Sequence, residues 1–203
     1  MQTPWACCFC RAGSPISTRR TGQGAGLSVA EASAAMEAKP GFVCALCGTA
    51  HEGCPTDRGY TLPDDVWALP ESEHETRATF TTDLCEMDGR YFIRGILLIP
   101  FVQRDADFAW GVWAELERSA FERYVEIYDA DASDEPPVGA TLANAIPGFP
   151  DAARERVLVI WGQSGDRPEF VLEKHSESSL AEAQRCGIDE QRYHELLIAA
   201  GAI

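Results

Sequence analysis

The chain has 203 residues, the length of one domain or occasionally two, and 45% of them are apolar, which is enough for a hydrophobic core. Its 32 acidic residues outnumber 17 Lys and Arg, so the formal net charge is −15. This charge repels phosphate backbones and anionic lipid headgroups. The composition therefore argues against nucleic acid or a membrane as a partner. It would attract a basic protein partner or a cationic ligand, and simple solubility is the other interpretation of the same charge.

The sequence carries no sign of export or membrane insertion. Its longest apolar run, residues 96–102, contains a proline and falls far short of the roughly 20 residues that a spanning helix needs. No basic segment followed by an apolar stretch marks a secretory signal. We therefore expect a cytoplasmic location, where close spacing among the eight cysteines indicates metal binding or catalysis rather than disulfides.

A change in composition divides the chain near residue 40. The first forty residues are rich in Gly, Ser, Ala and Thr and carry a net charge of +2, whereas the remainder carries −17. The apolar surface of residues 1–40 is too small to offset the entropy lost on ordering. We expect a disordered or weakly helical N-terminal extension, followed by a single α+β domain over residues 41–203.

The first half of this domain combines a cysteine knuckle, two short helices and a hairpin. Residues 63–69 and 70–77 each open with a proline and acidic residues, which suit a helix start. Strands are predicted at 78–87 and 90–101, joined by Asp88-Gly89, a strong hairpin signal. In the next predicted strand, 108–116, Trp113 lies on the face opposite the other large apolar residues, which predicts a helix packed over it.

The second half alternates short strands and helices. A helix capped by Ser119 is expected to about residue 128, then strands at 138–142, 156–161 and 169–173. Ser178 or Ser179 begins a further helix that Gly187 ends, and Asp189 caps the last one. This order lacks βαβ alternation, so we predict an antiparallel β-sheet with helices mainly on one face, the α+β class.

Several short motifs, taken in order, resemble the bacterial family catalogued as domain of unknown function 2199. They are Cys44-x-x-Cys47-Gly48 with His51, Asp83-Leu84-Cys85, Phe92-Ile93-Arg94-Gly95, Trp110-Gly111-Val112-Trp113 and Leu180-Ala181-x-x-Gln184-x-x-Gly187-Ile188. The resemblance covers about residues 42–188 and implies no known activity. One departure is that Ser178 and Ser179 stand where the family often has His-Pro.

The cysteine knuckle predicts a structural zinc site. A Cys-x-x-Cys-Gly turn lets Cys44 and Cys47 converge on one ion, but zinc prefers four ligands and no second Cys-x-x-Cys pair follows. The resemblance implies Cys85 and His51 as the further ligands, with Cys54 as an alternative ligand. A pair of reduced buried thiols or a redox pair stays open as another interpretation.

Arg94 interrupts an otherwise apolar strand. A buried guanidinium needs a carboxylate or several carbonyls as partners. Asp83, on the adjacent predicted strand, is the candidate partner in a structural ion pair. The alternative is that Arg94 binds an anion, bidentate to a carboxylate or phosphate.

Three classes of function remain open from the sequence. The favoured one is a binding or interaction module with a structural zinc, whose acidic surface meets a basic partner. A zinc-dependent enzyme would need three protein ligands, an open position and a nearby base such as Asp83 or Glu86. The third class is an acidic immunity-type protein that neutralises a basic effector. The net charge of this chain fits that class, but no other feature of the sequence does. The sequence does not decide whether the protein is an enzyme.

Overall fold

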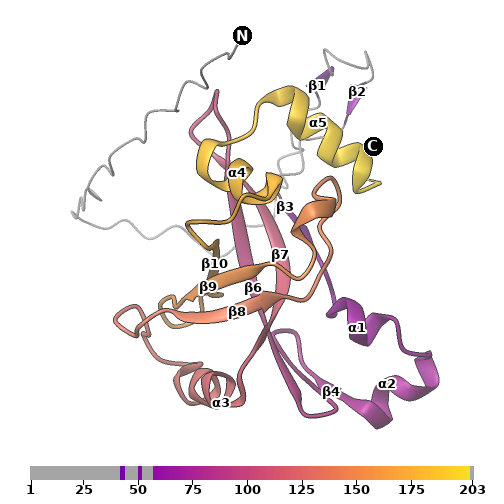
Figure 1. Cartoon of the computed structure of the whole chain (residues 1–203), viewed down its shortest axis with the longest axis vertical. Coiled ribbons are helices and arrows are strands. Elements are labelled where there is room, and N and C mark those ends of the chain that lie inside the picture. The colour runs from indigo at the N-terminus through magenta and orange to yellow at the C-terminus, as the bar shows by residue number, and fades with distance from the viewer. Residues whose placement is uncertain (1–41, 44–49, 52–56, 202–203) are drawn as a thin grey trace, which may run out of the picture.

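The computed structural model describes residues 42–43, 50–51 and 57–201 (Figure 1). The strands are β1 (Phe42–Val43), β2 (Ala50–His51), β3 (Asp57–Gly59), β4 (Ala78–Phe80), β5 (Leu84–Met87), β6 (Arg90–Pro100), β7 (Asp107–Leu116), β8 (Val138–Leu142), β9 (Arg156–Ile160) and β10 (Glu169–Leu172). The helices are α1 (Asp64–Trp67), α2 (Glu71–Arg77), α3 (Arg118–Ile127), α4 (Ser179–Cys186) and α5 (Glu190–Ala199), with a 3-10 turn at Pro150–Ala152.

The strands β6 to β10 close into a barrel. Each pairs antiparallel with the next along the chain, and β10 returns to pair with β6. Directions alternate through such a meander, so the first and fifth strands run the same way and the closing pair must be parallel. That pair joins Glu169 to Ile96. The remaining strands extend the sheet, with β5 and β4 beyond β6 and β3 beside β7.

The α+β class is confirmed, but the wholly antiparallel sheet is wrong. Both β6–β10 and β3–β7 are parallel pairs. The helices also do not gather on one face: α3 lies at one end of the barrel, α4 and α5 lie at the other, and α1 and α2 flank the β4–β5 extension (Figure 1). Alternation within a strand shows which side chains are buried, but it does not show which distant strand lies alongside.

Two apolar clusters stabilise this arrangement. The larger fills the barrel and contains fully buried Ile93, Leu97, Phe108, Val112 and Phe170. The smaller lies on the other side of the β5–β6–β7 sheet and includes Phe92, Trp113 and Val66 of α1. The predicted helix over Trp113 is therefore confirmed, and it explains why β6 and β7 are apolar on both faces.

Most element boundaries follow the sequence signals. The Asp88-Gly89 turn has positive φ at both residues, which a type I′ hairpin turn requires. Ser178 accepts a bond from the backbone of Ala181 at 3.1 Å and so caps α4. Gly187, with φ of 82°, ends that helix as predicted. The cap predicted for α3 differs, because the helix begins at Arg118, one residue before Ser119.

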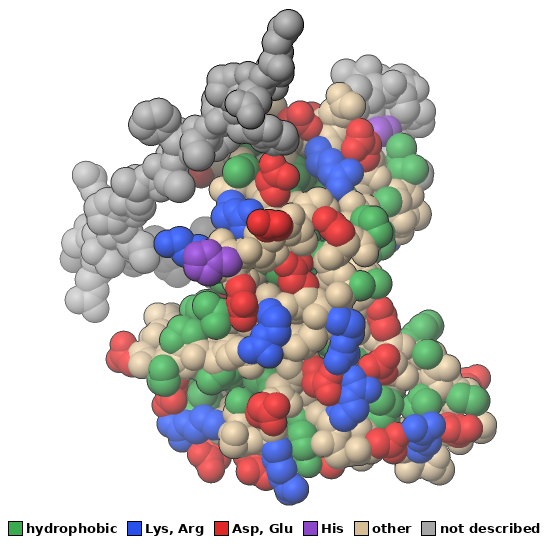
Figure 2. Space-filling model, viewed as in Figure 1, with side chains coloured by type: hydrophobic (Ala, Val, Ile, Leu, Met, Phe, Trp, Pro, Cys, Tyr) green, Lys and Arg blue, Asp and Glu red, His purple; other side chains and the backbone are tan. Residues whose placement is uncertain are grey.

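Charged side chains of both signs are interspersed over the face shown in Figure 2. Many form ion pairs, so the strongly negative total does not appear there as one continuous acidic surface. None of the helices that the structure describes has the length and apolar character needed to cross a membrane. The predicted extension over residues 1–40 lies outside the described residues.

Candidate functional site

Strand β6 changes its neighbour partway along one edge. The backbone N–H of Arg94 donates to the carbonyl of Asp83, just before β5, at 2.9 Å. Two residues later, the N–H of Ile96 donates to the carbonyl of Pro168, just before β10, also at 2.9 Å. The two neighbouring segments diverge from this point. We call this place on β6, between Arg94 and Ile96, the branch point. A cleft opens beside the branch point.

Asp83 supplies the polar floor of the cleft. Its backbone is held in the β4–β5 turn, where Asp83 and Leu84 both donate N–H bonds to Oγ1 of Thr81 at 3.2 and 3.0 Å. Its carboxylate accepts a bond from Nε of Arg167 at 2.6 Å and one from the Tyr128 hydroxyl at 3.0 Å. Burial alone would raise the pKa of Asp83, but these bonds hold it below its usual range. Asp83 is therefore a fixed anion.

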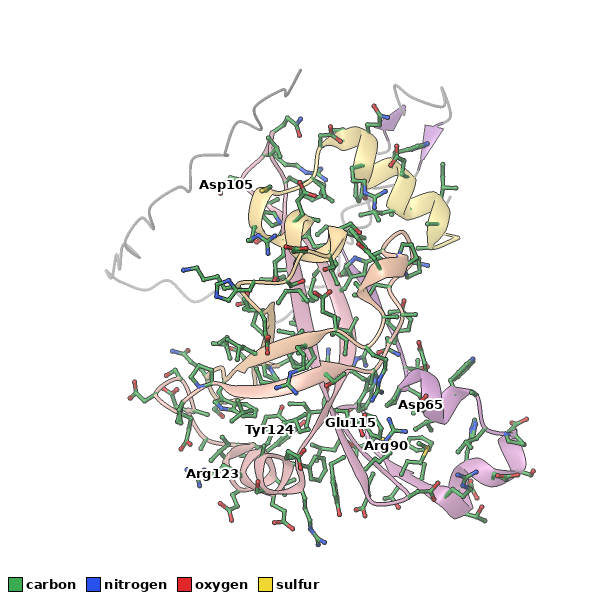
Figure 3. The ribbon with its side chains drawn as sticks, in the orientation of Figure 1. Asp65, Arg90, Asp105, Glu115, Arg123 and Tyr124 are labelled. Atoms are coloured by element: carbon green, nitrogen blue, oxygen red, sulfur yellow. The ribbon has the colours of Figure 1, made fainter. Side chains whose placement is uncertain are left out.

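Two tyrosines from the end of α3 form an aromatic wall. Tyr124 is buried and stacks on Trp161 of the barrel at 5.3 Å between ring centroids. Figure 3 shows Tyr124 between α3 and the barrel strands, with Arg123 directed elsewhere. Tyr128 follows one turn later, is 40% exposed and meets Tyr124 edge to face at 5.6 Å. The buried ring holds the exposed ring in place at the cleft.

The cleft has a volume of about 440 Å³. Beyond the residues above, its lining consists of Ile96, Asp129, Gly165 and Asp166. Gly165 has φ of 86°, which permits the tight turn that presents Asp166 and Arg167. Within the described part of the chain, the carboxylates of Asp129 and Asp166 take part in no hydrogen bond or ion pair. The cleft thus offers two unpaired carboxylates beside an aromatic wall.

The structure pairs Asp83 with Arg167 rather than with the predicted partner, Arg94. The backbones of Asp83 and Arg94 are bonded, as expected for neighbouring strands. The side chains diverge, because Arg94 extends across β7 toward Gly111 and Gly59. The sequence did not indicate Arg167 and Tyr128 as partners of Asp83, because nothing in it connects their segments with Asp83. Gly165-Asp166 predicted only a turn.

Of the predicted metal ligands, only Cys85 has a described side chain. It is 1% exposed and lies in the smaller apolar cluster, and burial raises the pKa of its thiol to about 11. Cys44, Cys47 and Cys54 lie outside the described residues, and His51 is described in its backbone alone. Among the described side chains, no three His, Cys, Asp or Glu residues gather in a way that suits a metal ion.

A second polar cluster lies between α1 and the lower part of β7 in Figure 3, where Asp65, Arg90 and Glu115 point toward one another. Arg90 bonds Glu115 through both Nε and Nη2 at 2.7 Å and reaches Asp65 at 2.7 Å. Bonding by Arg90, with help from Arg154, lowers the pKa of Glu115 to about 2. Every charged side chain of this cluster is in an ion pair, so the cluster joins α1 to the sheet and leaves no unpaired charge to bind a ligand.

The serines that replace the His-Pro of the related motif are part of the α4 start. The Ser178 hydroxyl donates to Glu155 at 2.6 Å while it caps the helix. Ser179 bonds Asp151 through its hydroxyl at 2.6 Å and through its backbone at 2.8 Å. In this chain the position therefore joins α4 to the segment before β9 and has a structural role.

Comparison with known protein families gives a match over most of the domain. The family model described as "Uncharacterized protein conserved in bacteria (DUF2199)" matches residues 43–188. The matched range includes the branch point, the aromatic wall and Arg94. Neither the curated proteins nor the solved structures gave a significant match.

Proposed function

The chain belongs to this family of uncharacterised bacterial proteins, and we propose that its domain is a binding module whose branch-point cleft receives a basic group of a partner protein. The observation that supports this proposal is the pairing of two uncompensated carboxylates, Asp129 and Asp166, with the tyrosine wall in one cleft. A lysine or arginine side chain is the protein group with matching chemistry.

The contacts available in the cleft suit a cation in three ways. Carboxylates form charge-assisted hydrogen bonds with ammonium and guanidinium groups. Aromatic faces such as that of Tyr128 attract cations, and Arg does this more often than Lys. The hydroxyl of Tyr128 is already committed to Asp83, so the ring face and the two free carboxylates supply the recognition.

The charge of the whole protein supports the same partner. A net charge of −15 raises the association rate with basic proteins and lowers it with nucleic acids. Acidic and basic side chains alternate on the viewed surface (Figure 2), so net charge alone does not select a docking site. The cleft supplies that local selection. A basic effector of an immunity-type protein is one partner with this chemistry.

Titration with tetra-arginine and tetra-lysine peptides tests the proposal. We expect saturable binding that weakens as ionic strength rises. The double variant Asp129→Asn/Asp166→Asn should lose at least about tenfold in affinity, because each 1.4 kcal/mol of lost contact is tenfold in Kd. Isothermal titration calorimetry measures this loss directly.

The matched control carries the same change of charge elsewhere. Glu71 and Glu75 are exposed on α2, and Glu71→Gln/Glu75→Gln should retain wild-type affinity within about twofold, apart from the screened long-range field. Equal weakening by both double variants would show that total charge, and not the cleft, attracts the peptide. Peptide binding that both variants leave unchanged would also reject the proposal.

We further propose that the knuckle holds a structural zinc within its own hairpin. Strands β1 and β2 pair antiparallel, with Phe42 opposite His51, and so bring together the two ends of the segment that contains Cys44 and Cys47. Figure 1 shows β1 and β2 near α5, at the opposite end of the long axis from the β4 hairpin to which Cys85 belongs. This placement favours His51 and Cys54 over Cys85 as the remaining ligands.

Metal analysis of the untagged protein tests the zinc proposal. We expect stoichiometric zinc in the wild type and its loss in Cys44→Ser and Cys47→Ser, because each removes one thiolate ligand. Cys85→Ala is the control and should keep the metal while it loses stability through the cavity it leaves. Metal-free wild-type protein would reject the zinc site, and loss of metal from Cys85→Ala would reject the local ligand set.

A further inference from the structure

Arg94 lies at the branch point, where its backbone bonds Asp83, and its side chain extends across β7. Its guanidinium extends over two glycines that face each other in the register of β3 and β7, Gly59 and Gly111. A Cβ at Gly59 would lie 2.8 Å from Nη2 of Arg94, and one at Gly111 would lie 3.6 Å from it. The glycines thus leave a flat backbone floor on which the guanidinium rests, and a side chain at Gly59 would displace it.

The charge of Arg94 lacks a partner within the described part of the chain. Every other arginine between residues 57 and 201 donates a hydrogen bond or forms an ion pair with a described residue. The Nε atom of Arg94 is buried and unbonded. The negative charge of Asp83 acts on Arg94, but Arg167, Tyr128 and Thr82 already bond that carboxylate.

The surroundings of Arg94 therefore disfavour the positive charge of its guanidinium. Burial, followed by the positive charge of Arg167, lowers the pKa of Arg94 from its ordinary value. A half-buried charge without a partner is costly, and an apolar side chain of similar length would pack on the same floor without that cost. An anion that bonds the planar guanidinium would offset the cost, and Arg suits this task because its donors match two coplanar oxygens.

We propose that Arg94 anchors a second binding site, for a small oxyanion of the carboxylate or phosphate class, on the sheet surface over Gly59 and Gly111. Arg94 is not among the residues that line the proposed cleft, so this is a second site beside it. Its ligand bonds the guanidinium through two oxygens and supplies the negative charge that no described residue provides.

Titration of the wild-type protein with inorganic phosphate and with acetate, at constant ionic strength in chloride, tests this site. The ¹⁵N resonance of the Arg94 Nε–Hε group should shift saturably with one or both anions, and the thermal midpoint should rise with the same dependence on concentration. Arg94→Gln should weaken binding at least about tenfold, since a bidentate charge-assisted contact is lost. The two anions distinguish a carboxylate ligand from a phosphate ligand.

Arg118→Gln, which removes an exposed arginine of α3, should bind as the wild type does. An equal rise of the midpoint in Arg94→Gln and wild type would mean a general salt effect and would overturn the site. If Arg94→Gln does not fold, the wild-type Nε–Hε titration decides alone. A resonance that responds to neither anion means that Arg94 is satisfied internally, which also overturns the proposal.

Discussion

Replacing Gly95 with alanine is expected to lower the free energy of unfolding by about 3 kcal/mol, the upper part of the usual range for overpacking a core. A Cβ at this position would lie 2.4 Å from Cζ of Phe170 and 2.7 Å from the carbonyl of Pro168. Phe170 is fully buried in the barrel, so its ring cannot move without disturbing the core. Denaturant unfolding measures the loss.

Gly139→Ala is the matched control, because it also adds a methyl group to a glycine within a barrel strand. Its Cβ would meet only the end of the Arg156 side chain, at 2.9 Å, and that side chain is 64% exposed and can move away. We expect a change within about 1 kcal/mol. Similar stabilities for the two variants would contradict the close packing of β6 against β10.

The substitution Gln184→Leu is expected to cost about 2–3 kcal/mol, because each lost bond contributes about 1 kcal/mol. The Gln184 amide donates to the carbonyls of Leu98 and Phe170 at 3.2 and 3.0 Å, and it accepts from the N–H of Leu172 at 2.8 Å. These bonds join β6 to β10 where the barrel closes through a single parallel residue pair. Leucine keeps the volume of the side chain and leaves the three backbone groups unpaired.

Gln191→Leu on α5 provides the comparison, since Gln191 is exposed and its side chain bonds exposed Glu195 at 3.3 Å. Its unfolding midpoint in denaturant should stay close to that of the wild type. If Gln184→Leu also left the unfolding midpoint close to that of the wild type, the Gln184 amide would not be needed to close the barrel. The structural role that we assign to Gln184 would then be wrong.

Local structure was largely predictable from the sequence, because its causes are local. The Asp88-Gly89 turn, the Ser178 cap and the C-terminal Gly187 are each determined by backbone conformations that few residues adopt. Barrel closure was not predictable in this way. It depends on the return of β10 to β6, and the contacts responsible, such as Gly95 against Phe170, join residues far apart in the chain.

The candidate cleft shows the same limit. Asp83 was recognised as a residue of interest, and its carboxylate is indeed in an ion pair. Its partner comes from a turn 84 residues later, whereas strand order predicts Arg94 on the adjacent strand. Neighbouring backbones do not guarantee that side chains meet, because Arg94 follows the open space above Gly59 and Gly111.

Both proposed sites lie along β6. At its divided edge, Asp83 and Arg167 come from the two segments that separate there and form the cleft floor. Beside them, Arg94 interrupts the apolar pattern and extends to the other edge. Glycine at 95 then allows β10 to approach closely enough to close the barrel. The strand thus joins the fold to both proposed binding surfaces.

The most direct measurement is a map of amide chemical-shift changes on addition of tetra-arginine peptide to the isotopically labelled protein. We expect saturable changes centred on Tyr124, Tyr128, Gly165 and Asp166, which line the cleft, and their loss in Asp129→Asn/Asp166→Asn. Saturable changes centred on another surface, such as the acidic first turn of α2, or no saturable change at all, would contradict a basic-group site at the branch point.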